Sequence, residues 1–201
     1  MFVFDNGRIN VMAENRCANT SMYRYFNIPI YSQMMKHHRH ELRSIWKQNP
    51  SEKIVVLRHP YQRISSAIAY HERQAKQFYY DFTSMSPEEQ QKNPLFWGYK
   101  HLPDMSYEQF RQADIQSHCL PYLHHLIGFN FRYINFDRIS EYLPIKAGPI
   151  TDTVNKEFSD DFLEFFRVDD LKFEERLYQE YLQRFKEISP DEWKYMKRNE
   201  T

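Results

Sequence analysis

The chain alternates between short apolar runs and longer stretches in which apolar side chains recur every three or four residues. The runs Ile9–Ala13, Ile54–Leu57 and Phe131–Phe136 predict strands. Ile54–Leu57 (IVVL) has no polar residue, which is typical of a central parallel strand buried on both faces. Phe2–Phe4 and Ile9–Ala13 flank an Asn-Gly turn signal at Asn6-Gly7, so they predict an opening β-hairpin.

Helix signals follow several of these runs. Pro60 stands where a first helical turn tolerates proline, and apolar side chains from Ile64 to His71 continue at helical spacing. The other predicted helices are Thr20–Phe26, Ser32–Lys47, Ser106–Ala113, Asp137–Leu143, Ser159–Arg167, Lys172–Ile188 and a last one after Ser189. The polar residues 81–105, with three prolines, predict a long variable loop, and Gly148–Lys156 predicts another.

Strands followed by helices at this spacing predict a three-layer α/β domain with a central parallel sheet flanked by helices. A length of 201 residues fits one domain with a sizeable core, and neither an internal repeat nor an interdomain linker is visible. We therefore expect a single domain over residues 1–201.

The charge balance limits the classes of partner. Lys and Arg together number 27, as do Asp and Glu, so the formal net charge is zero. A general polyanion binder has a basic excess, so nucleic-acid binding is not expected. Any anion site must come from local clustering of cations.

The cysteine pattern and the termini point to an intracellular protein. Cys17 and Cys119 are the only cysteines, and two free thiols are preferred over one disulfide. The sequence has no metal-binding motif, no signal-peptide pattern and no apolar window of the ~18–20 residues that a membrane span requires. We expect a cytoplasmic protein without a metal or a membrane partner.

The first candidate site is the segment Arg16–Ser21 (RCANTS), after the run Ile9–Ala13. Its small residues let the backbone approach a ligand. Backbone N–H groups at a helix start, with the Thr20 and Ser21 hydroxyls, can hold phosphate or sulfate oxygens, and Arg16 adds a permanent charge. The segment is not a Walker P-loop, because it lacks the two glycines and the lysine. The alternative is that Thr20 or Ser21 only caps a helix.

The second candidate site is Arg58–Ser66 (RHPYQRISS), after the strand Ile54–Leu57. An unpaired guanidinium at the end of a buried strand is costly, so Arg58 requires an anionic partner. Ser66 can supply a hydroxyl to the same anion. The alternative is a salt bridge between Arg58 and a carboxylate. Because parallel strands end at one edge of a sheet, the two segments predict neighbouring sites for phosphate-like groups.

Both segments resemble the cofactor-binding motifs of sulfotransferases that use 3'-phosphoadenylyl sulfate (PAPS), particularly the carbohydrate and heparan-type branch. Asn15–Ser21 is similar to the first motif, P-K-x-[AG]-[SC]-T-[ST]. Arg58–Ser66 is similar to the second, R-[DN]-P-x-x-R-x-x-S-[AY]-Y, with Tyr70 displaced from the final aromatic. Further segments that resemble the family, in the same order, are Met105–Phe110, Asp114–His118, Phe131–Ile139 and Val154–Lys156.

The resemblance implies a P-loop-NTPase-like domain that moves a sulfuryl group from PAPS to a hydroxyl or amine of a small-molecule or carbohydrate acceptor. By position, the residues that would bind the 5'-phosphosulfate are Arg16, Cys17, Ala18, Asn19, Thr20 and Ser21. Arg58 with Ser66 would bind the 3'-phosphate. Arg16 departs from the family's usual lysine, which contacts the bridging oxygen; arginine can stabilise charge there but is a poor proton donor.

The general base is expected between the two motifs, in His37–His40 (HHRH), because several related enzymes keep a catalytic histidine upstream of the second motif. Imidazole suits this role through its near-neutral pKa. His40 is the first candidate and His38 the second; the alternative is a solvated histidine-rich helix face. His118 is a further candidate near the acceptor.

Two other functions compete with the sulfotransferase. One is a catalytically weak or silent relative that retains the PAP or PAPS pocket, for which the arginine at position 16 is the best support. The other is a nucleotide or nucleoside kinase-like protein, which the missing Walker lysine disfavours.

Overall fold

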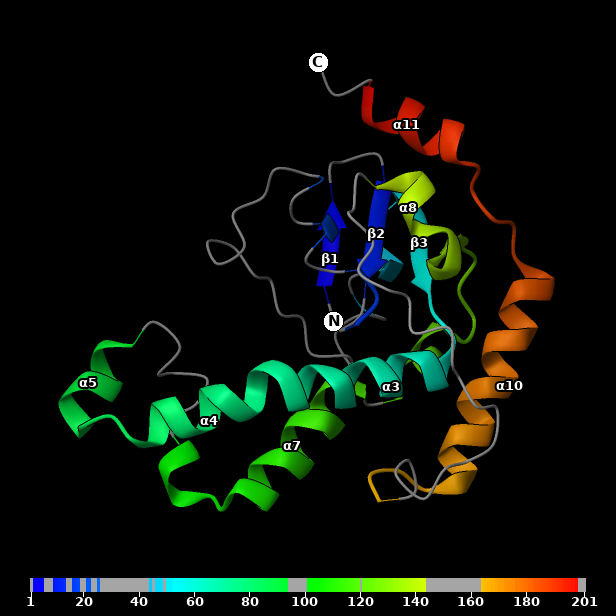
Figure 1. Ribbon diagram of the computed structural model, residues 1–201. Helices are drawn as coiled ribbons and strands as arrows, with labels where there is room; N and C mark the ends of the chain where they lie inside the picture. Colours follow the sequence, from blue (N-terminus) through cyan, green and yellow to red (C-terminus); the bar gives the residue numbers. More distant parts are fainter. Residues whose placement is uncertain are drawn as a thin grey trace.

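The computed structural model describes residues 2–5, 9–13, 16–18, 21, 22, 25, 44, 46–48, 50–93, 101–119, 121–143 and 164–198. Its strands are β1 (Phe2–Asp5), β2 (Ile9–Ala13), β3 (Glu52–Leu57) and β4 (Arg132–Asn135). They form one sheet in the order β1-β2-β3-β4, in which β2, β3 and β4 are parallel (Figure 1). The expected hairpin is confirmed, since β1 pairs antiparallel with β2. The fold is mixed α/β with a small open parallel sheet.

Helices fill most of the remaining described chain. The α- and π-helical segments are α3 (Pro60–Tyr70), η1 (His71–Ala75, π-helical), α4 (Lys76–Thr83), α5 (Pro87–Lys92), α7 (Tyr107–Cys119), α8 (Ile139–Tyr142), α10 (Val168–Arg184) and α11 (Pro190–Arg198). Three 3₁₀ turns complete the set: η2 (Leu102–Asp104), η3 (Leu123–Leu126) and η4 (Phe136–Arg138). None of these helices is long and apolar enough to cross a membrane.

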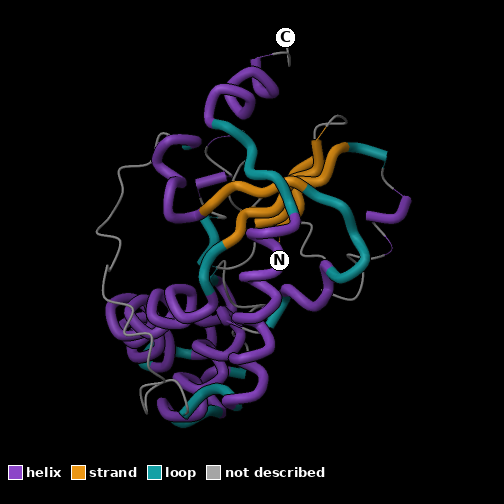
Figure 2. Tube along the Cα trace, turned by 90° about the vertical axis from the view of Figure 1, so that its right-hand side faces the viewer, coloured by secondary structure: helices purple, strands orange, loops and turns teal. Residues whose placement is uncertain are grey.

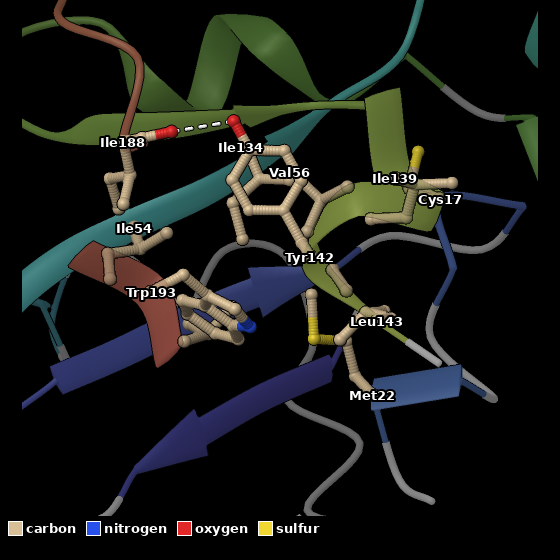
Figure 3. Packing of buried hydrophobic residues seen from close by; sticks show 12 residues of the cluster. Cys17, Met22, Ile54, Val56, Ile134, Ile139, Tyr142, Leu143, Ile188 and Trp193 are labelled. Carbon is tan, nitrogen blue, oxygen red and sulfur yellow. Dashed lines mark hydrogen bonds between the residues drawn. The ribbon is translucent and has the colours of Figure 1, made fainter. Parts of the chain in front are cut away.

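The parallel strands are apolar because both faces of the sheet are covered. On one face, alternate strand residues such as Val56 and Ile134 pack against three side chains (Figure 3). These are Tyr142 of α8, Ile188 of the segment before α11, and Trp193 of α11. The Tyr142 hydroxyl donates to the carbonyl of Ile188 at 2.6 Å, the dashed line in that view. On the other face, the residues that pack together include Met12, Val55, Leu57, Tyr133, Trp46, Leu123, Leu177 and Tyr181.

The helix α3 starts directly after β3 and so lies at the carboxyl ends of the parallel strands. Pro60 is its first residue, as the sequence predicts, and His59 Nδ1 accepts the N–H of Tyr61 at 3.3 Å, which caps the helix. The helix continues through η1 into α4, and α7 packs alongside it (Figure 1). The largest group of helices therefore lies beyond one end of the strands (Figure 2).

Several predicted boundaries are confirmed by capping contacts. Ser106 and Gln109 exchange hydrogen bonds of 2.8 and 3.2 Å before α7, and Ser189 and Glu192 do so at 3.2 Å before α11. The helix α7 runs six residues beyond the predicted end at Ala113, because Ile115 and Cys119 on its buried face continue the apolar spacing.

Three predictions are wrong where the structure describes them. The predicted helix Ser159–Arg167 is not helical over residues 164–167, its described part, and α10 begins only at Val168. The expected loop 81–105 contains the end of α4, the helix α5 and the turn η2, because Phe82 packs into the core and Ser86 opens α5 with a capping box. The predicted helix Lys172–Ile188 ends at Arg184 in α10, since Lys186 and Ile188 instead make backbone hydrogen bonds to Tyr133. Most of the predicted helix Ser32–Lys47, and the loop Gly148–Lys156, lie outside the described residues.

Candidate functional site

Both candidate segments meet at one edge of the sheet. The register pairs Met12 of β2 with Val55 of β3, so the two strands end side by side. Arg16 lies three residues beyond the end of β2, and Arg58 follows β3 directly. The helix α3 then brings Ser66 to the same edge. We call Arg16, Arg58 and Ser66 the strand-end cluster.

Ser66 bonds to Arg16, rather than to Arg58 with which the sequence grouped it. Its Oγ accepts from Arg16 Nε at 3.1 Å and from Arg16 Nη2 at 2.9 Å. A serine hydroxyl has two lone pairs and one proton, so the two arginine donors leave only the proton to be donated. No acceptor for that proton is found among the described residues. An oxygen atom of a bound anion is a suitable acceptor.

Arg58 is more deeply buried and holds the first segment in place. The residue is 7% exposed, and its Nη1 donates to the backbone carbonyl of Arg16. Its guanidinium carbon lies 4.0 Å from the ring centroid of Phe136, the residue after β4. Its buried Nε has no hydrogen-bond partner. Arg58 therefore connects the ends of three parallel strands and still has a donor to offer.

Among the described residues, no counter-ion balances the positive charge of the strand-end cluster. Within the part of the chain that the structure describes, neither Arg16 nor Arg58 has a carboxylate within salt-bridge distance, so the carboxylate alternative for Arg58 finds no support there. Burial lowers the pKa of both guanidinium groups, and the nearby charge of Arg16 lowers that of Arg58 further. Unpaired charges in such surroundings cost several kcal/mol each. The arrangement is suited to an anion with more than one negative charge.

The backbone at Arg16 and Ala18 is in the left-handed region, with φ of 62° and 60°. Residues other than glycine pay a penalty of about 1–2 kcal/mol there, and such strain collects at ligand-binding sites. The Ala18 carbonyl accepts the N–H of Met22 at 2.9 Å, and Ser21 and Met22 are helical. The helical residues Ser21 and Met22 lie within the helix that the sequence predicts over Thr20–Phe26.

The thiol of Cys17 is fully buried in the hydrophobic core, with its Sγ 4.0 Å from the hydroxyl of Tyr122. It is also close enough to Arg58 to affect the pKa of that guanidinium. Neither Cys17 nor Cys119 forms a disulfide in the described structure, and burial raises the pKa of Cys119 to about 11.

Four of the predicted site residues, Asn19, Thr20, His38 and His40, lie outside the described residues. His118 is described: its ring centroid lies 5.3 Å from that of Tyr70, and the Arg16 guanidinium carbon lies 4.8 Å from the same Tyr70 ring.

Phe136 is the site residue that sequence reasoning missed. The sequence predicts Phe136 only as the last residue of a strand. The signal that finds it is that β4 neighbours β3, so the residue after β4 lies beside the residue after β3.

No protein-family model, curated protein or solved structure matches the chain. Among the described residues, no group of three or more His, Cys, Asp or Glu side chains could hold a metal ion. The functional inference therefore depends on the geometry of the strand-end cluster.

Proposed function

We propose that the chain is a PAPS-dependent sulfotransferase with a three-layer, P-loop-NTPase-like fold, and that PAPS binds at the strand-end cluster. The observation that carries the proposal is the pair of neighbouring guanidinium groups, half-buried Arg16 and buried Arg58, without a carboxylate partner in the described chain. PAPS carries two separate anionic groups, the 5'-phosphosulfate and the 3'-phosphate, and two neighbouring cations match that charge pattern.

The assignment of groups follows the order of the strands. The 5'-phosphosulfate is proposed to bind along Arg16–Ser21 and the 3'-phosphate at Arg58. Sulfuryl transfer resembles phosphoryl transfer, with in-line attack and charge that develops on the leaving oxygen. Arg16 would stabilise that charge, and Ser66 would hold the guanidinium in position while its own proton goes to an anionic oxygen.

A catalytically silent PAP-binding relative is the second candidate. It is favoured by the bonding of Arg16, because two of its N–H donors already point to Ser66, and by the arginine at a position where related enzymes have lysine. A kinase-like protein is the third candidate. The small-molecule or carbohydrate acceptor and the cytoplasmic location are part of the proposal as predictions from the sequence.

Calorimetric titration with PAP, adenosine 5'-phosphosulfate, ADP and ATP tests the proposal. We expect PAP to bind most tightly, because only PAP combines a 5'-phosphate with a 3'-phosphate. Equal or tighter binding of ADP or ATP would refute the PAPS site and favour the kinase-like alternative. Single-turnover release of PAP from PAPS then separates an enzyme from a silent relative.

A further inference from the structure

A buried polar network lies beside the strand-end cluster, between η1 and α7. His71 is fully buried, and its Nδ1 lies 3.1 Å from Oδ2 of Asp114, which is itself buried. The Nε2 of His71 lies 3.2 Å from the hydroxyl of Tyr107. Both ring nitrogens of His71 are therefore occupied. The π-helical turn η1 begins at His71. Such turns are rare in proteins, and those that occur are often found at functional sites.

The same carboxylate serves a second histidine on α7. His118 Nδ1 lies 2.7 Å from the backbone carbonyl of Asp114 and 3.5 Å from its Oδ1. A carbonyl oxygen only accepts hydrogen bonds, so Nδ1 must carry the proton. In the neutral imidazole the lone pair is then on Nε2. That atom has no hydrogen-bond partner among the described residues, and the His118 side chain is 22% exposed.

His118 is within reach of the transfer site. Its ring and the Arg16 guanidinium both contact the ring of Tyr70, at 5.3 and 4.8 Å from its centroid. The imidazole and the guanidinium carbon are therefore at most about 10 Å apart. An in-line transfer with hydrogen bonds of about 2.8 Å at each end spans roughly 9–10 Å from base to cation. The upper limit set by the two contacts with Tyr70 is therefore compatible with one acceptor oxygen and one sulfuryl group between His118 and Arg16.

We propose that His118 is the general base of this site and that Asp114 is its positioning residue; the inference rests on the proposed sulfotransferase function. The acceptor O–H bond breaks and its proton moves to His118 Nε2. The acceptor oxygen forms the new O–S bond, while the S–O bond to the bridging oxygen breaks and its electron pair leaves with PAP. The buried Asp114 carboxylate faces the imidazolium that forms, as a carboxylate does behind a catalytic histidine.

His71 and Tyr107 have the supporting role in this arrangement. His71 contacts Oδ2 of Asp114 through Nδ1, and Tyr107 contacts the other ring nitrogen of His71, so Oδ1 is the carboxylate oxygen that lies toward His118. The titratable and charged groups around the imidazole and its cation are Asp114, Cys119, Tyr70, His71, Arg16 and Arg73. Asp114 is the only carboxylate among these groups in the part of the chain that the structure describes.

The first test measures the tautomer directly and does not depend on turnover. Long-range ¹H–¹⁵N spectra of the full chain with labelled histidine report which ring nitrogen is protonated. We expect the neutral His118 ring to carry its proton on Nδ1, and the exposed His101 serves as the reference histidine. A proton on Nε2 of neutral His118 would overturn the proposal, because no lone pair would then face the site.

The second test uses release of PAP from PAPS with water as the acceptor, so no acceptor has to be identified. His118→Ala should lower the single-turnover rate ~100–10,000-fold and remove the acid limb of the pH–rate profile, with the Kd for PAP unchanged. Added imidazole should restore part of the rate, which a merely structural histidine would not allow. Asp114→Asn should lower the maximal single-turnover rate without a change in the PAPS concentration that gives half of that rate. His101→Ala is the matched control and should behave as the parent chain.

The outcomes separate this inference from the proposed function. Parent-like turnover in His118→Ala would overturn the assignment of the base and leave the sulfotransferase intact. A parent chain that binds PAP but never releases it from PAPS would overturn both the enzyme and its base. Failure of the parent chain to bind PAP would refute the proposed function, and with it the role of His118 as its base.

Discussion

Replacing Arg58 with methionine removes a buried charge while it keeps an unbranched side chain of similar reach. In the ligand-free chain two effects oppose each other. The Arg16 carbonyl loses its donor, at a cost of about 1–3 kcal/mol, and an unpaired cation disappears, which relieves a penalty of several kcal/mol. We therefore expect the ligand-free unfolding free energy of Arg58→Met to equal or exceed that of the parent.

When PAP is bound, Arg58→Met should be less stable than the parent. A charge-assisted contact between a guanidinium and a phosphate contributes about 1.5–3 kcal/mol, so PAP should bind Arg58→Met roughly 10- to 150-fold more weakly. At a PAP concentration of 100 times the parent Kd, binding stabilises the parent by about 2.7 kcal/mol. A variant with 30-fold weaker binding would gain only about 0.9 kcal/mol. For a chain of this length the PAP-induced rise in Tm should fall from roughly 5–11 °C to about 2–4 °C.

Thermal unfolding with and without PAP measures this difference, and Arg132→Met is the matched control. Arg132 belongs to the same sheet but pairs with Glu52 at 3.1 Å and Glu192 at 2.7 Å. Its replacement should lower the ligand-free Tm and leave the PAP-induced rise unchanged. Adenosine 5'-phosphosulfate, which lacks the 3'-phosphate, should bind Arg58→Met nearly as well as the parent. A parent-like PAP response would refute the anion site at Arg58, and equal losses for both ligands would show that Arg58 does not recognise the 3'-phosphate.

Three further variants test the surroundings of the cluster. Ser66→Ala should weaken PAP binding roughly 5- to 30-fold by calorimetry, because it removes one donor and releases Arg16, whereas Ser65→Ala should bind as the parent does. Arg16→Ala should lower the single-turnover rate of PAP release by orders of magnitude with little change in PAP affinity. Arg16→Lys should retain or raise that rate. An unchanged rate in Arg16→Ala would exclude Arg16 from the mechanism. The raised pKa of Cys119, about 11 against 9.0, means that the folded chain keeps a proton that the unfolded chain loses, so stability falls as the pH rises between these values. In urea unfolding the parent should lose roughly 1.4 kcal/mol more per pH unit there than Cys119→Ala, and identical slopes would contradict a buried thiol.

Local patterns predicted those parts of the fold that depend on neighbouring residues. The hairpin follows from a turn signal between two apolar runs, and β3 follows from four consecutive apolar residues. The caps at Ser106 and Ser189 depend on contacts three residues apart, so the sequence alone contains them. The end of α10 at Arg184 was missed because the following segment pairs with Tyr133, a partner about fifty residues away.

The candidate site divides in the same way. The strand ends were predictable, and with them the positions of Arg16 and Arg58. The partners of these side chains were not, because they depend on how α3 crosses the edge of the sheet. That crossing places Ser66 against Arg16, and the neighbouring strand places Phe136 over Arg58. A motif specifies which residues are present, whereas the packing of distant elements decides which of them touch.

The zero net charge bears on how the unpaired cations Arg16 and Arg58 are interpreted. The chain has as many acidic as basic side chains, so a shortage of carboxylates does not explain the strand-end cluster. Elsewhere in the described structure arginines do pair: Arg111 contacts Glu72 and Glu164, and Arg138 contacts Glu141 and Glu187. Those pairs are at the surface, where each contributes little to stability. Arg58 is buried and Arg16 is half-buried, so an unpaired charge costs more there than at the surface, and yet no described carboxylate pairs with either of them. A sequence under selection for stability alone would place an apolar residue at these positions, so the cost is best explained by an anion that arrives from outside the chain.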